Sequence, residues 1–165
     1  ASKANMAESG EYVFCMFLTD KFAHWKAAYS FAKKKGLRLA IVPYGGFSYM
    51  QKGALYTAAS VGDWLALIRD ARYVITDSFH VAVFSIIYER QFYIFQRFKE
   101  NEYTSQNARV DNLLEITGTK DHYIRYGSCR IAVNKDINYR EIKEMLKKEI
   151  ETSKQFLKQA IEGEK

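Results

Sequence analysis

Short strand-forming runs alternate with segments of helical periodicity along this chain, and this alternation restricts its fold more than any other feature. Apolar runs rich in strand-forming residues lie at 12–18, 38–43, 54–58, 73–76 and 92–95. Segments with apolar residues at helical spacing lie between them, at 21–36, 64–71 and 79–89. Short connections between such elements favour parallel strands joined by crossover helices. We therefore predict an α/β domain whose parallel sheet has helices on both faces and the strand order 3-2-1-4-5.

The remainder of the chain adds helices and one more candidate strand. Residues 108–117 have helical periodicity up to Gly118, and the segment HYIRY at 122–126 is a candidate sixth strand. Asp63 has the position of an N-cap for the helix that follows it. Residues 138–162 form a long amphipathic pattern, which we expect to pack on the domain through a face made by Ile142, Met145, Leu146 and Ile150.

The length and composition suit one folded domain. With 165 residues and 48% apolar residues, the chain can bury a substantial core. We expect residues 12–165 to form this single domain. Residues 1–11 lack the apolar stretch of a signal peptide and are interpreted as a linker or a cloning remnant. No apolar run reaches the length of a membrane span.

Cysteine usage and charge exclude several classes of protein. Cys15 and Cys129 cannot build a disulfide framework, which favours the reducing cytoplasm. No Cys or His cluster has the spacing of a zinc site, so we expect no metal. The formal charge of +6 is attributed to lysines on solvated helix faces, such as 33–35. Because no basic patch is interleaved with aromatic residues, we expect no nucleic-acid partner.

Ligands of an open parallel sheet bind beyond the carboxyl ends of its strands, and this rule selects residues 43–46, 77–80 and 96–97. At 77–80 the chain passes from a strand into a helix, whose exposed amides and dipole favour anions. His80 lies in the first turn and is a candidate general acid or base. Asp77 is a candidate to orient that ring or to hold a substrate hydroxyl. Ser78 has the position of a helix cap, and capping alone could explain both Asp77 and Ser78.

Residues 62–95, GDWLALIRDARYVITDSFHVAVFSIIYERQFYIF, resemble the C-terminal region of the polysaccharide pyruvyl transferase family. The shared pattern is a leader helix, the block TDSFH, an apolar helix and a strand. The resemblance continues through Arg97 into QNARVDNLLEITG at 106–118. Three positions differ. The family's usual Gly after the histidine is Val81, some branches have Arg where this chain has Ser78, and the common Ser before the arginine of the later block is Ala108.

The resemblance implies a Rossmann-like domain that forms the C-terminal half of a two-domain, GT-B-like protein, with the active site between the halves. It implies transfer of pyruvate from phosphoenolpyruvate to a saccharide acceptor, lipid-linked or free, as a cyclic ketal and without a cofactor. The family's catalytic histidine corresponds to His80, and we assign Asp77 to the same catalytic group. Because guanidinium matches carboxylate and phosphate in a two-pronged geometry, we expect the substrates to be bound by Arg97 and Arg109 together with Ser78 and Asn107.

Two alternatives to pyruvyl transfer stay open. One is a GT-B-type glycosyltransferase half that binds a sugar nucleotide, and the other is a degenerate binding domain without catalysis. Aromatic residues of the 44–62 loop could stack on an acceptor sugar or pack in the core, namely Tyr44, Tyr49 and Tyr56. A cleft enzyme needs both walls, so we expect this domain alone to be inactive and the intact protein to be a transferase. We expect it in the cytoplasm, the inner face of the membrane included.

Overall fold

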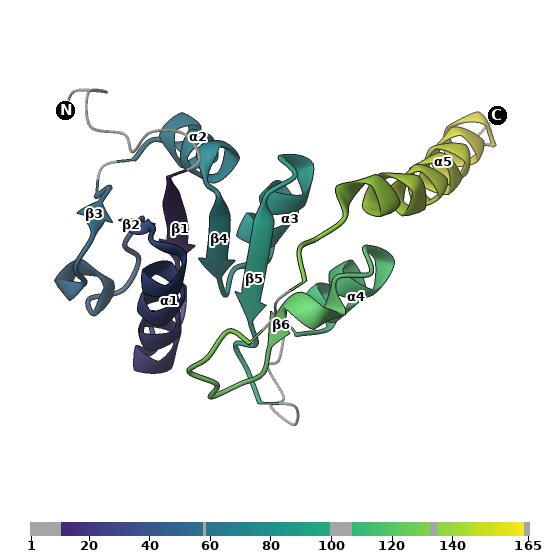
Figure 1. Ribbon diagram of the computed structural model, residues 1–165. Helices are drawn as coiled ribbons and strands as arrows, with labels where there is room; N and C mark the ends of the chain where they lie inside the picture. The colour runs from purple at the N-terminus through teal and green to yellow at the C-terminus, as the bar shows by residue number, and fades with distance from the viewer. Residues whose placement is uncertain (1–10, 58, 100–106, 133–134, 164–165) are drawn as a thin grey trace.

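The computed structural model describes residues 11–57, 59–99, 107–132 and 135–163. One sheet of parallel strands has the order β3-β2-β1-β4-β5-β6, as Figure 1 shows. Its strands are β1 (Tyr12–Met16), β2 (Arg38–Ile41), β3 (Ala54–Leu55), β4 (Tyr73–Thr76), β5 (Gln91–Phe95) and β6 (Tyr123–Ile124). The predicted order 3-2-1-4-5 is confirmed, and the candidate sixth strand pairs with β5.

Crossover helices connect the strands and cover both faces of the sheet. They are α1 (Phe22–Lys35), α2 (Val61–Asp70), α3 (Phe79–Ile87) and α4 (Asn107–Ile116), with short 3₁₀ turns η2 (Ser48–Met50) and η3 (Lys120–His122). The helix α5 (Tyr139–Glu162) follows the last strand. One face packs on α1, and the other packs on α2, α3, α4 and the start of α5. The predicted Rossmann-like α/β fold is therefore confirmed.

The side chains of β1 alternate between the two hydrophobic clusters on opposite faces of the sheet. Tyr12 and Phe14 point into the cluster beneath α2 and α3, whereas Val13 and Cys15 point into the cluster beneath α1. Successive side chains of a strand point to opposite faces, so a central strand with helices on both sides must be apolar throughout. This requirement explains the unbroken apolar run at the start of the domain.

The start of α2 differs from the expectation for Asp63. Ser60, not Asp63, is the N-cap: its Oγ accepts a 3.2 Å hydrogen bond from the Asp63 amide. The Asp63 carboxylate accepts a 3.1 Å hydrogen bond from the Ser60 amide in return. The two residues form a capping box, which places the first helical residue before Asp63.

The long helix α5 packs on the domain over only its first turns, contrary to the expectation for its apolar face. Ile142 is buried and Leu146 is partly buried against the core, but Met145 and Ile150 are 43% and 50% exposed. A helix of 24 residues is about 36 Å long and continues beyond the sheet, as Figure 1 shows. Among the described helices, none combines the length and apolar content needed to cross a bilayer.

Candidate functional site

The strand order reverses direction between β1 and β4, and the two loops that follow these strands lead to helices on opposite faces. In open parallel sheets a crevice forms at such a point, beyond the carboxyl ends of the strands. The loop after β1 spans 17–21, and the turn after β4 contains Asp77 and Ser78. The sequence-predicted block TDSFH therefore lies at the topological switch point.

Asp77 ties these two loops together. Its carboxylate is buried and accepts hydrogen bonds from the Leu18 amide at 2.6 Å, the Thr19 amide at 2.9 Å and the Thr19 hydroxyl at 2.5 Å. Thr76 adds a second tie, since its hydroxyl donates to the Met16 carbonyl at 2.7 Å. With its carboxylate engaged in this way, Asp77 is placed to position the crevice. It does not lie in contact with solvent.

The histidine beside Asp77 is His24, in the first turn of α1. Its Nδ1 lies 3.9 Å from Asp77 Oδ2, and no described residue forms a hydrogen bond with this atom. The ring packs against Phe95 and Phe17, with centroids 4.4 and 5.1 Å away. Burial is the main cause that lowers the pKa of His24 to about 4, and the charge of Lys21 adds to it, against the opposing effect of Asp77. The imidazole is therefore neutral at pH 7.

His24 was not among the residues selected from the sequence. It stands three and four positions before Ala27 and Ala28, and seven before Phe31, all of which are buried under α1. A histidine in register with the buried stripe of a helix is a signal that could have identified it.

His80 is exposed in the first turn of α3. Its ring meets the Phe79 ring edge-on, with 5.7 Å between centroids. Ser78 occupies the N-cap position, as predicted. Its hydroxyl makes no capping hydrogen bond, however, so the side chain does not cap α3. Val81 is fully buried in the core beneath α3, and its side chain does not crowd the exposed helix start.

Four of the six selected residues line one small cavity of about 20 Å³, enough for about one water molecule: Asp77, Arg97, Asn107 and Arg109. His80 and Ser78 do not line it, although Phe79 does and contacts the His80 ring. The Arg109 guanidinium lies 5.3 Å from the centre of the Phe79 ring. One aromatic side chain thus links the exposed histidine to the arginine cluster.

The two arginines and the asparagine are held in different ways. Arg97 Nε is buried, and no described residue accepts a hydrogen bond from it, while the guanidinium lies 5.1 Å from the Phe98 ring centre. Asn107 donates from Nδ2 to the Phe98 carbonyl at 3.0 Å, which anchors the start of α4. Arg109 is exposed. The arrangement places two guanidinium groups at this edge, and guanidinium matches the geometry of carboxylate and phosphate.

Lys21 adds a cation that the sequence analysis did not select. It stands at the N-cap of α1, and its Nζ donates to the Arg97 carbonyl at 2.9 Å and lies 4.0 Å from the Tyr126 ring centre. The strand β1 and the segment after β5 are far apart in sequence, so only the folded sheet brings Lys21 to Arg97. Positive charge from three elements therefore gathers at the switch point.

The loop after β2 borders the same edge, as expected for 44–62. The Ser48 amide donates to Asp20 Oδ2 at 2.8 Å, and Gly45 lies so close that a Cβ there would stand 2.6 Å from the same oxygen. Tyr44 and Tyr49 are exposed on this loop. In the part of the chain that the structure describes, no three His, Cys, Asp or Glu side chains gather as a metal site would require.

Comparison with family models gives a match to part of the chain. The model of the family described as polysaccharide pyruvyl transferase matches residues 20–97, a stretch that contains the TDSFH block and Arg97. A search of curated proteins finds no match. The matched segment includes α1, α3 and the residues Lys21, Asp77 and His80.

Solved structures similar to this chain are GT-B-type enzymes. UDP-GlcNAc 2-epimerase of Methanocaldococcus jannaschii has a TM-score of 0.50 and 11% identity, over 84% of this chain and 38% of that one. The Neisseria meningitidis UDP-GlcNAc 2-epimerase has a TM-score of 0.48 and 11% identity, over 94% and 40%. E. coli heptosyltransferase WaaC has a TM-score of 0.46 and 9% identity, over 89% and 46%. The chain spans less than half the length of these three proteins. At 11% identity, the similarity to the Methanocaldococcus jannaschii epimerase supports the fold alone.

Proposed function

We propose that this chain is the C-terminal domain of an enzyme that transfers pyruvate from phosphoenolpyruvate to two hydroxyls of a saccharide. The family match over residues 20–97 and the GT-B-like fold support a domain of a glycan-modifying enzyme. The observation that carries the finer proposal is the exposed His80 at a helix start, whose ring meets Phe79, the aromatic residue that also lies against Arg109.

The reaction needs a proton donor, a base and anion-binding groups. A proton delivered to the methylene carbon of phosphoenolpyruvate turns it into a methyl group and leaves an oxocarbenium-like centre on the neighbouring carbon. One sugar hydroxyl attacks this centre and loses its proton. The bond to the phosphate oxygen then breaks, phosphate leaves, and the second hydroxyl attacks and loses its proton. The products are a cyclic ketal and inorganic phosphate.

The described residues can be assigned to these tasks. His80 transfers the protons, since it is exposed at the start of α3. Arg97 and Arg109 hold the carboxylate and the phosphate, and Lys21 adds positive charge. Asp77 acts as a positioning residue, because its carboxylate fixes the β1 and β4 loops. Ser78 and Asn107 stay proposed substrate contacts.

A second domain would supply the other wall of the cleft. We propose that it lies N-terminal to this one and binds the saccharide, which is free or lipid-linked. Positioning of two reactants can account for about 7–11 kcal/mol of barrier lowering, which one open wall does not provide. We propose that the intact enzyme acts in the cytoplasm, at the inner face of the membrane, and that the single domain is inactive.

The test follows phosphate release from phosphoenolpyruvate by the intact enzyme with a panel of free, nucleotide-linked and lipid-linked sugars. We expect His80→Ala to lower kcat by about 100-fold or more, the usual contribution of a general acid or base. Arg97→Lys keeps the positive charge but loses the two-pronged hydrogen bonding of the guanidinium, so it should raise KM for phosphoenolpyruvate. Arg72→Ala is the matched control, because this exposed arginine stands at the opposite edge of the sheet.

Three outcomes would contradict the proposal. Turnover that survives His80→Ala would remove the histidine from the mechanism. Selective binding of a sugar nucleotide without binding of phosphoenolpyruvate would favour a glycosyltransferase half. The absence of both activities across the panel would favour a degenerate binding domain.

A further inference from the structure

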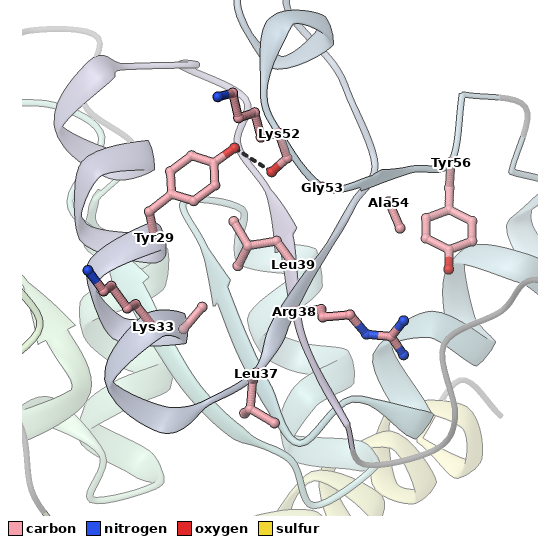
Figure 2. Close-up of a pocket in the computed structure, with 10 residues that line it drawn as sticks. Tyr29, Lys33, Leu37, Arg38, Leu39, Lys52, Gly53, Ala54 and Tyr56 are labelled. Carbon is pink, nitrogen blue, oxygen red and sulfur yellow. Dashed lines mark hydrogen bonds between the residues drawn. The ribbon is translucent and has the colours of Figure 1, made fainter.

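A groove of about 530 Å³ lies at the outer edge of the sheet, and Figure 2 shows the residues around it. It shares no lining residue with the small cavity at the switch point. This volume lies in the range of small-molecule sites. Its apolar walls come from the end of α1, the start of β2 and β3, and are made by Ala32, Leu37, Leu39 and Ala54.

The groove exists because the edge strand is short. β3 has two residues, which pair with Ala40 and Ile41 of β2. The preceding residues of β2, Arg38 and Leu39, have no strand partner on that side among the described residues. Leu39 belongs to the core beneath α1, so the apolar core reaches the surface here.

Two contacts give the groove a fixed shape. The Tyr29 hydroxyl, on α1, donates to the Lys52 carbonyl at 2.6 Å and joins the helix to the segment before β3, as the dashed line in Figure 2 marks. Gly53 lies tightly on β2, because an added Cβ would stand 3.0 Å from Ile41 Cδ1 and 3.1 Å from the Leu39 carbonyl oxygen. The groove is therefore part of the folded structure.

The charged residues around the groove are all cations. Lys33 of α1, Arg38 of β2 and Lys52 before β3 line it, and no carboxylate does. All three are exposed and form no ion pair with another described residue. In Figure 2 their charged ends point away from one another, so they do not converge on one small anion. They match negative charges spread over a surface.

We propose that this edge of the domain binds an anionic membrane surface, with Lys33, Arg38 and Lys52 on lipid headgroups and hydrocarbon in the apolar groove. A bilayer supplies both components at once, negative charge spread over an area and apolar chains beside it. Inorganic phosphate supplies only the first component. The proposal does not depend on pyruvyl transfer, because no residue of the switch point takes part in it.

The test measures binding of the purified protein to lipid vesicles by sedimentation. Vesicles of phosphatidylcholine with about one third phosphatidylglycerol should bind the protein, and pure phosphatidylcholine should not. Each cation near an anionic surface contributes about 1 kcal/mol, so the triple variant Lys33→Gln, Arg38→Gln and Lys52→Gln should bind about 100-fold more weakly. The matched control makes the same charge change on α5, with Lys147→Gln, Lys148→Gln and Lys154→Gln, and should lose much less.

A further variant tests the apolar walls separately from charge. Ala54→Phe adds a ring at an exposed position of the groove and leaves all three cations, so it should weaken vesicle binding while the unfolding temperature stays unchanged. Equal losses in the groove and α5 variants would overturn the proposal in favour of nonspecific charge. Binding to an acidic peptide but not to vesicles, or self-association that Ala54→Phe abolishes, would overturn it in favour of those occupants.

Discussion

The imidazole of His24 faces the carboxylate of Asp77, with 3.9 Å between Nδ1 and Oδ2, and both side chains are closed to solvent. His24 stands at the start of α1, which follows β1, and Asp77 stands at the end of β4; these two strands flank the switch point. The buried His24–Asp77 pair thus joins the two halves of the sheet beneath the candidate site. Its stability can be tested apart from any catalytic assay.

The first prediction concerns the carboxylate of Asp77. Asp77→Ala leaves the partly buried amides of Leu18 and Thr19 without their acceptor, at a cost of about 1–3 kcal/mol in the free energy of unfolding. Urea unfolding of the two proteins measures this difference. Asp70→Ala is the control, because it breaks an exposed ion pair with Arg69 that contributes less than about 1 kcal/mol. Equal effects of the two substitutions would contradict the assignment of Asp77 as a structural tie.

The second prediction concerns pH. Because folding lowers the pKa of His24 from 6.5 to about 4, the unfolded chain binds the proton more readily. This residue's contribution is therefore fully present above pH 6.5 and is lost as the pH falls from 6.5 to 4, by about 3 kcal/mol. Urea unfolding at several pH values should show a shallower slope in this window for His24→Gln. An unchanged slope would show that His24 does not titrate in this way.

The third prediction compares two adjacent glycines. A Cβ at Gly45 would stand 2.6 Å from Asp20 Oδ2, and this carboxylate is held by Ser48 and by the Trp25 indole at 2.7 Å. Gly45→Ala should therefore cost about 1–3 kcal/mol in the free energy of unfolding. Nothing lies within 4 Å of a Cβ at Gly46, so Gly46→Ala should change stability by less than about 0.5 kcal/mol. Thermal unfolding of the pair checks whether the loop packs on Asp20.

The fourth prediction concerns the two ends of α5. Ile142 is 3% exposed and belongs to the core, whereas Ile161 is 74% exposed. Ile142→Ala should lower the free energy of unfolding by about 2–4 kcal/mol, and Ile161→Ala should leave it nearly unchanged in this chain. A comparable loss at Ile161 would mean that the distal half of α5 is buried in solution.

Local patterns in the sequence were sufficient to predict most of the sheet. The strand and helix positions follow from apolar periodicity, because a central strand must be apolar on both faces and a surface helix on one. The candidate block at 77–80 follows from the rule for parallel sheets together with the family pattern. One error was local: Asp63 was assigned as a cap because Ser60 was not recognised as its partner in a capping box. The other concerned packing, because periodicity predicted an apolar face on α5 but not that Met145 and Ile150 lie beyond the core.

Only the folded chain decided which side chains meet. The contact between Lys21 and Arg97 joins residues 76 positions apart, and the tie between Leu18 and Asp77 joins residues 59 apart. The burial of His24, and with it the lowered pKa, arises from packing against Phe17 and Phe95. Periodicity reports which face of an element is buried, but contacts depend on the order of the strands and on the space between layers. For this reason the sequence determined the architecture and the location of the candidate site, and tertiary packing determined its partners.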